Sequence, residues 1–244
     1  MNGGYKRILL KLSGETLKTN AQCLDPKTVL DVARQIREDT VGAQVALVIG
    51  AGNLFRGLPA SRHGLTRTGA DTIGMLATVM NALAMADALE AVGMPTRVQS
   101  AIPVAGAADP FDRRRAIAHL EAGRVVIFAG GTGHPFFTTD TTAALRACEI
   151  GANAVFKATK VDGIFTADPK QHPEARRYRR LAYADALTQR LGVMDATAFS
   201  LCQENNIPIV VFNFFRPNGL RCALAGDLNA ATAVGHDPTE LDAG

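Results

Sequence analysis

The sequence lacks several features that mark large classes of protein. It contains no tryptophan, and aromatic residues make up only 6% of its 244 residues. Its four cysteines, Cys23, Cys148, Cys202 and Cys222, are widely spaced and form no CxxC pair. This spacing disfavours a metal site built from thiolates and suits a reducing compartment. We therefore expect a cytoplasmic protein.

Long apolar runs and a concentrated basic face are missing as well. No run approaches the ~18 apolar residues that suggest a membrane span, and the start MNGGYKRILLKLSG does not resemble a signal peptide. The net charge is +3, with lysines and arginines scattered along the chain. Nucleic-acid-binding domains usually gather such residues on one face. We expect no membrane association and no nucleic-acid partner, and we interpret RRR (113–115) and RRYRR (176–180) as solvated faces.

Two common nucleotide-binding signatures are also absent or incomplete. The sequence has no GxxxxGK[ST], which excludes a P-loop enzyme. The segment GAGNLF has glycines at positions 50 and 52, but Phe55 stands where the dinucleotide fingerprint requires a third glycine. A hydride-transfer enzyme is therefore disfavoured.

The chain does show regular alternation of predicted strands and helices, and 47% of its residues are hydrophobic. Strands are predicted at 5–12, 44–49, 96–99, 124–129, 154–157 and 207–212. Helices are predicted at 26–39, 70–92, 112–122, 139–150, 182–191, 195–205 and 217–225. Several strands are continuously apolar, which is typical of strands covered on both faces. These patterns predict an α/β protein, a single-domain αβα sandwich over residues 1–244 with a largely parallel central sheet.

Four polar loops follow predicted strands: KLSGE, GAGNLFRG, GGTGHPFFTTD and KATKVDG. Ligands of such sheets bind beyond the carboxyl ends of the strands, and glycine-rich loops before helices attract phosphate groups. Each glycine could instead serve only its own turn. Four such loops on one edge favour a site for more than one phosphate group.

The charged residues of these loops each allow two interpretations. Lys11 either extends to solvent or faces an anion, and the neighbouring Ser13 and Gly14 favour the anion. Arg56, Lys157 and Lys160 in the other loops would add to this positive charge.

The carboxylates are similarly ambiguous. Asp71 either complements a helix dipole or accepts a hydrogen bond from a ligand hydroxyl. Asp140 lies where Thr138 and Thr139 compete to cap the next helix. Asp162 and Asp168 fall in a turn-rich segment and could act only there.

Taken in order, seven segments closely resemble motifs of the bacterial uridylate kinases, a family of the amino acid kinase superfamily. They are KRILLKLSGE, GAGNLFRG, GADTIGMLATVMNALAMADAL, SAIP, GTGHPFFTTD, KATKVDGIFTADP and VMDATAF, and the similarity spans roughly residues 5–225. The resemblance implies the amino acid kinase fold and transfer of the γ-phosphoryl group of ATP to UMP. It also implies Mg²⁺ as cofactor, held mainly by the nucleotide phosphates and not by protein ligands.

The resemblance also assigns roles to individual residues. It implies that Lys11, Arg56 and Asp140 are catalytic. The implied ATP-binding residues are Lys11, Leu12, Ser13, Gly14, Gly52, Arg56, Thr159, Phe165 and Asp168. The implied UMP-binding residues are Ala51, Asp71, Thr132, Gly133, His134, Pro135, Phe136, Phe137, Thr138 and Thr139. Residues 5–165 would carry the acceptor and phosphate loops, and residues 166–235 would lie on the ATP side.

The resemblance further implies a homo-oligomer, typically a hexamer built from dimers, with UTP as an inhibitor and GTP as a candidate effector. The chain departs from the family pattern at three places. Ala51 stands where the family commonly has glycine, and His134 where it commonly has asparagine. The loop Thr16–Cys23 has no glycine, which predicts weak or altered activation by GTP. A kinase for a carboxylate or carbamate acceptor, or a non-catalytic nucleotide-binding regulator, remains an alternative at this point.

Overall fold

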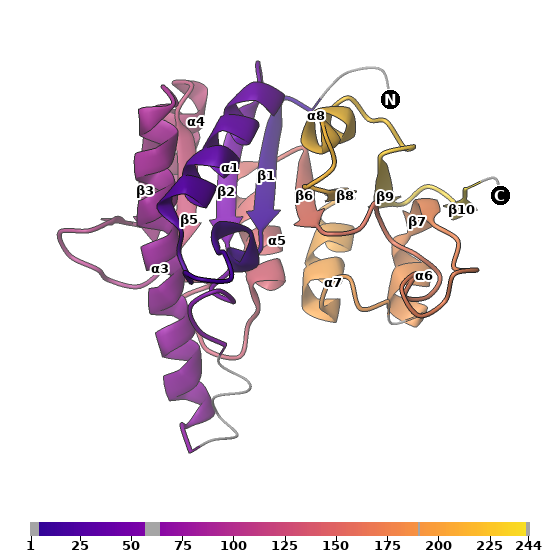
Figure 1. The fold of residues 1–244 in the computed structure, drawn as a ribbon, viewed down its shortest axis with the longest axis horizontal. Helices are drawn as coiled ribbons and strands as arrows, with labels where there is room; N and C mark the ends of the chain where they lie inside the picture. Colours follow the sequence, from indigo (N-terminus) through magenta and orange to yellow (C-terminus); the bar gives the residue numbers. More distant parts are fainter. Residues whose placement is uncertain (1–4, 57–63, 190, 243–244) are drawn as a thin grey trace.

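The computed structural model describes residues 5–56, 64–189 and 191–242, and it places a ten-stranded sheet between two layers of helices (Figure 1). The strands are β1 (Arg7–Leu12), β2 (Gln44–Ile49), β3 (Thr96–Ser100), β4 (Asp109–Pro110), β5 (Val125–Ala129), β6 (Ala154–Thr159), β7 (Tyr178–Ala182), β8 (Ile209–Asn213), β9 (Ala231–Gly235) and β10 (Glu240–Leu241). Their order across the sheet is β10-β7-β9-β8-β6-β1-β2-β5-β3-β4.

Neighbouring strands are parallel except in the pairs β8–β9 and β10–β7, which are antiparallel. The register places Lys11 of β1 opposite Val48 of β2 and opposite Lys157 of β6. Two lysines therefore lie side by side near the carboxyl ends of adjacent parallel strands.

The helices cover both faces of the sheet. Residues of α1 (Pro26–Asp39), α3 (Arg67–Ala91) and α8 (Gly219–Leu224) share one hydrophobic core with alternate strand residues such as Ile8 and Leu10. Residues of α4 (Arg113–Glu121), α5 (Thr139–Ile150), α6 (Tyr183–Thr188) and α7 (Ala196–Glu204) share the other core with Leu9 and its equivalents. This arrangement confirms the predicted αβα sandwich.

Local capping explains why several helix boundaries were predictable. The Asp25 carboxylate accepts a hydrogen bond from the Thr28 N–H at 2.7 Å, and Pro26 occupies the first turn of α1. Thr138 caps α5 through the N–H groups of Asp140 and Thr141, and Gly151 ends α5 with φ 62°.

The sequence interpretation was wrong at the segment RRYRR (176–180). Arg177 is only 8% exposed, and β7 begins at Tyr178. Burial is possible because the guanidinium of Arg177 meets carbonyl and carboxylate oxygens from distant parts of the chain. The short strands β4, β9 and β10 were also not predicted. The run 113–115 does lie exposed on α4, as expected.

The helix α3 is strongly apolar. By length and composition alone it could cross a membrane, since an 18-residue window has mean hydropathy 1.4. It packs on the sheet through Val79, Ala82, Met85 and Leu89, which belong to one hydrophobic core. Its N-terminal turns continue past the carboxyl edge of the sheet (Figure 1).

Candidate active site

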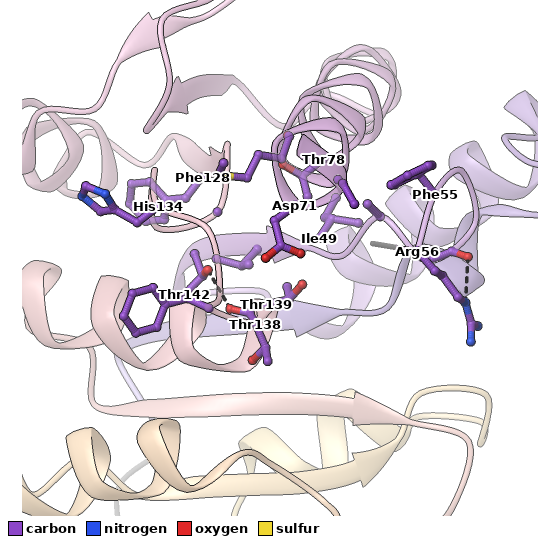
Figure 2. A pocket seen from close by; sticks show the side chains of 18 of the residues that line it. Ile49, Phe55, Arg56, Asp71, Thr78, Phe128, His134, Thr138, Thr139 and Thr142 are labelled. Carbon is purple, nitrogen blue, oxygen red and sulfur yellow. Dashed lines mark hydrogen bonds between the residues drawn. The ribbon is translucent and has the colours of Figure 1, made fainter. Parts of the chain in front are cut away.

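A pocket of about 290 Å³ lies at the carboxyl edge of the sheet, between α3, the loop after β2 and the loop after β5 (Figure 2). Its lining includes Ala51, Gly52, Arg56, Asp71, Gly131, His134, Thr138 and Thr139. Figure 2 shows the carboxylate of Asp71 and the side chain of Thr139 facing the same space, whereas the side chain of Thr138 points away from Asp71. Two of the four loops singled out from the sequence thus form one cavity.

A compact group of charges lies close to this edge. The carboxylate of Asp140 contacts the Lys11 ammonium through Oδ1 at 2.9 Å and the Lys157 ammonium through Oδ2 at 2.5 Å. Lys157 also donates a hydrogen bond to the carbonyl of Val193. The side chains of Lys11, Asp140 and Lys157 are 13%, 15% and 10% exposed. Two cations and one anion leave this centre with a net positive charge suited to phosphate.

The protonation behaviour of the centre follows from burial and charge. Burial raises the pKa of Asp140, but Lys11 and Lys157 outweigh it, so the pKa of that carboxyl lies below its ordinary value. Burial lowers the pKa of Lys157, and the nearby Lys11 charge lowers it further against the opposing effect of Asp140. Asp140 is therefore a carboxylate at neutral pH, and it holds two lysines that would otherwise repel each other.

The loop after β5 owes its path to backbone conformations that favour glycine. Gly130, Gly131 and Gly133 have φ values of 74°, 60° and 85°. The hydroxyl of Thr78 on α3 accepts a hydrogen bond from the Gly130 N–H at 2.8 Å, which fastens the start of the loop. Phe136 also has positive φ, 73°, and its side chain is exposed.

Asp71 connects this loop to α3. Its Oδ2 accepts hydrogen bonds from the Phe136 N–H and from Nε of Arg67, each at 2.8 Å. The Arg67 guanidinium in turn lies 5.4 Å from the centre of the Phe136 ring. Asp71 is therefore more than a residue that complements the helix dipole.

The loops after β1 and β2 approach each other closely. A Cβ at Gly14 would lie 2.1 Å from Oδ1 of Asn53 and 2.4 Å from the carbonyl oxygen of Gly50, so only glycine fits there. Nδ2 of Asn81 on α3 donates to the Gly50 carbonyl and to Oδ1 of Asn53, both at 2.8 Å. Neither asparagine was predicted from the sequence. Asn81 is fully buried, and its place within the apolar run ATVMNALAM was a usable signal.

Two of the residues that depart from the family pattern, Ala51 and His134, lie near the pocket. Ala51 is not among the described non-glycine residues with positive φ, so its methyl group causes no backbone strain. His134 is exposed at the rim, and Figure 2 shows its ring directed away from Asp71. The histidine therefore leaves the centre of the pocket open.

Asp195, which was noted only as part of VMDATAF, joins α7 to α5. Its carboxylate accepts hydrogen bonds from the hydroxyls of Thr138 and Thr141, and it caps α7 through the Ala198 N–H at 2.8 Å. Because Thr138 and Asp195 serve the helix ends, Asp140 is left to contact the lysines. The capping alternative for Asp140 is thus filled by Thr138.

The predicted ATP-binding residues fall into two groups. Beside the charged centre, Ser13 caps the short 3-10 helix η1 (Gly14–Leu17), and the exposed Arg56 pairs with Glu15 at 2.8 Å. The side chain of Leu12 is in the hydrophobic core, so only its backbone can face a ligand. Gly52 lies in the loop after β2 and lines the pocket.

The second group lies in the segment after β6. The hydroxyl of Thr159 donates to the carbonyl of Val161 at 2.7 Å, and Phe165 forms a β-bridge with Arg177. The exposed Asp168 accepts from the Lys170 N–H at 3.0 Å within its own turn. Lys160 is also exposed. These residues do not contact the Asp140 centre directly in the described structure.

Comparison with known proteins agrees with this geometry. The model of the amino acid kinase family matches residues 6–213. The structure is similar to UMP kinase from Bacillus anthracis, with 38% identity and a TM-score of 0.93 over 99% of this chain and 100% of that one. It is also similar to UMP kinase from Ureaplasma parvum, with 39% identity and a TM-score of 0.89 over 94% and 98% of the two chains. Uridylate kinase from Archaeoglobus fulgidus matches at 29% identity and a TM-score of 0.72 over 93% and 99%. The chain therefore belongs to the amino acid kinase family, and within that family to the UMP kinases.

Proposed function

We propose that this protein transfers the γ-phosphoryl group of ATP to UMP, with UDP and ADP as products. The observation that carries the proposal is the Lys11–Asp140–Lys157 centre beside a pocket that contains a carboxylate and several hydroxyls. Phosphoryl transfer requires mainly positioned positive charge, because the protein itself does little covalent chemistry.

In this proposal an oxygen of the UMP phosphate attacks the γ-phosphorus, and the bond from that phosphorus to the bridging oxygen of ADP breaks. Lys11 contacts the transferring group and stabilises the charge on its oxygens. Asp140 acts on Lys11 as an orienting partner, since it contacts both ammonium groups. Arg56 and the backbone of Gly52 lie at the pocket wall, where they would bind phosphate oxygens.

We place the acceptor nucleotide in the 290 Å³ pocket, which has polar groups for its ribose and phosphate. Asp71 would accept a hydrogen bond from a ribose hydroxyl, and residues 132–139 with Ala51 would surround the base and phosphate. A carboxylate or carbamate acceptor would leave the pocket's polar groups without partners, which is unfavourable in a buried site. A non-catalytic regulator would not require two buried lysines that both contact one aspartate.

The donor nucleotide would lie over the carboxyl ends of β6 and β8, with Thr159, Phe165 and Asp168 on its adenosine side. Both oxygens of Asp140 face lysines, and no group of three or more metal-ligating side chains occurs in the described residues. The side chains near the site are therefore compatible with Mg²⁺ that is bound through the nucleotide phosphates. The ion would supply further positive charge to the phosphate oxygens.

The decisive experiment measures ADP release by the purified protein with ATP, Mg²⁺ and a panel of nucleoside monophosphates. UMP should exceed CMP, AMP and GMP in kcat/KM by orders of magnitude, because a base with the wrong polar groups leaves buried partners unpaired. Comparable kcat/KM for CMP would refute the assigned acceptor.

Assembly and regulation are also proposed from this site and from α3. Ile73, Leu76 and Met80 are 40%, 46% and 55% exposed and lie on one side of α3, which supports self-association into dimers and a cytoplasmic hexamer. UTP should inhibit by entering the UMP pocket, and its inhibition should weaken as UMP rises. GTP should activate weakly, and strong saturable activation in a GTP titration would contradict the role given to loop 16–23.

A further inference from the structure

A polar network holds the segment 160–165, here called the donor loop, and the proposed chemistry does not use this network. The donor loop follows β6, the strand that carries Lys157. The Ile164 N–H donates to the buried hydroxyl of Thr232 on β9 at 2.9 Å, and Nδ2 of Asn213 donates to Oδ1 of Asp162 at 3.0 Å. Strands β8 and β9 thereby fix the path of the loop backbone.

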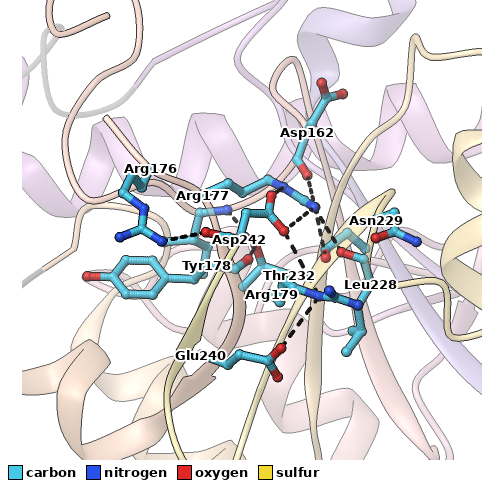
Figure 3. A network of polar contacts seen from close by, with 12 residues as sticks. Asp162, Arg176, Arg177, Tyr178, Arg179, Leu228, Asn229, Thr232, Glu240 and Asp242 are labelled. Carbon is cyan, nitrogen blue, oxygen red and sulfur yellow. Dashed lines mark hydrogen bonds and ion pairs between the residues drawn. The ribbon is translucent and has the colours of Figure 1, made fainter. Parts of the chain in front are cut away.

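Arg177 lies at the centre of the network (Figure 3). Its Nη1 donates to the carbonyl oxygens of Asp162 at 3.2 Å and Ala231 at 3.0 Å, and its Nη2 donates to the carbonyl of Leu228 at 2.9 Å. The two remaining hydrogen bonds go to Asp242, from Nε to Oδ2 at 2.8 Å and from Nη2 to Oδ1 at 3.2 Å. This two-point geometry is the strongest that arginine makes with a carboxylate.

Asp242 is itself fastened to the segment around Arg177. Its N–H donates to the Arg177 carbonyl at 2.9 Å, and its carbonyl accepts from Nη2 of Arg176 at 2.5 Å. Strand β10, just before Asp242, pairs antiparallel with β7. Asp242 is the carboxylate that contacts the buried guanidinium, and without it a buried charge would lack a counter-charge.

We propose that Arg177 and Asp242 form a positioning pair for ATP binding, which acts through the carbonyl of Asp162 on the donor loop. Without Asp242, the guanidinium is drawn towards solvent and releases that carbonyl. The loop then spends less time in the conformation that receives the nucleotide, and the apparent affinity falls by that fraction. The inference rests on the proposed function only in taking this loop as the ATP side.

The test compares wild type with Asp242→Asn, by the Kd for Mg·ATP in a calorimetric titration and by the KM values of both substrates. Coupling through one packed contact gives about a threefold to thirtyfold change. We expect Asp242→Asn to raise the Kd for Mg·ATP and the KM for ATP by this factor. The kcat and the KM for UMP should not change. Asp242→Glu, which keeps the charge, should recover part of the affinity.

Asp237→Asn is the matched control, since it removes an ion pair to Arg180 at 3.1 Å in the same segment and does not touch Arg177. Arg177→Lys is a second variant, because lysine keeps the charge but cannot form the two-point contact. An unchanged ATP affinity, equal losses for both substrates, or the same loss in Asp237→Asn would each overturn the inference. A wild type that binds Mg·ATP without phosphorylating UMP would contradict the proposed function alone, and the titrations would still decide the role of Asp242.

Discussion

The acceptor side and the donor side of the sheet are built by different means. The acceptor loop turns on three glycines of positive φ, exposes Phe136 and Phe137, and is tied down mainly by Thr78 and Asp71. The donor loop is held by a buried arginine whose partners lie up to 65 residues away. We infer that the acceptor side adjusts around its ligand, whereas the donor side is set before the ligand arrives.

The largest expected effect comes from the centre that both sides share. Lys11→Ala should lower kcat about a hundredfold to a thousandfold, as loss of one preorganised charge does. Folding should survive, because Lys11 is at a strand end. The control is Lys6→Ala, an exposed lysine just before β1. Turnover near that of wild type would show that another cation stabilises the transferring group and that the two sides do not meet at Lys11.

The second-largest effect is expected for Asp140→Asn. This variant should lower the free energy of unfolding by about 3 kcal/mol at neutral pH, because it leaves two lysines without their counter-charge. The lowered pKa of Asp140 means that its contribution is present above the unfolded value of about 3.9 and is lost as pH falls through the folded value. The difference between wild type and variant in denaturant titrations should therefore shrink below about pH 4. A difference that is constant with pH would contradict the charge-based explanation.

Asp71→Asn separates the two sides more finely. It should raise the KM for UMP roughly tenfold and leave the KM for ATP unchanged, because a hydrogen bond to a charged acceptor is lost only on the acceptor side. Asp87→Asn, on an exposed position of the same helix, is the matched control. Equal effects on both nucleotides would place Asp71 outside the UMP contacts.

The smallest effects are expected for two buried threonines, each of which accepts a hydrogen bond from a backbone N–H of one loop. Thr78 accepts from the Gly130 N–H on the acceptor side, and Thr232 accepts from the Ile164 N–H on the donor side. Thr78→Val and Thr232→Val should each cost about 1–2 kcal/mol of unfolding free energy, since each leaves a backbone N–H unpaired. Thr78→Val should also raise the KM for UMP, and Thr232→Val should raise the KM for ATP. Crossed or equal effects would remove the distinction between the sides.

The same division explains what could be predicted from the sequence. On the acceptor side, the glycine-rich loop, Asp71 and the cap of α5 are local patterns, and the bounds of α1, β2 and α5 were predicted correctly. On the donor side, an arginine-rich run looked like a solvated surface. Arg177 is buried only because residues 162, 228, 231 and 242 converge on it, and nothing local in the sequence indicates that convergence.

The charged centre shows an intermediate case. The loops singled out Lys11 and Asp140 as candidates, and the resemblance gave them catalytic roles. The contact of Lys157 with Asp140 instead depends on the register between β1 and β6. Asp195 could be noted as part of a motif, but its link to Thr138 and Thr141 requires the packing of α7 on α5. Pairings across the sheet and between helices are set by tertiary contacts, which single-sequence patterns do not carry.

The place of β7 in the sheet has a consequence for the protein's synthesis. Its only neighbours among the described strands are β9 and β10, and both follow it in the chain. On the ribosome, β1, β2 and β5 can pair as they emerge. The start of β7 can meet the earlier segment through the hydrogen bond from the Tyr178 N–H to the Ile164 carbonyl, but the rest of β7 must wait until residues 231–241 have been made. Unpaired strands invite aggregation, and charged side chains protect them. We infer that the arginines flanking Tyr178 help to keep the nascent chain soluble during that interval.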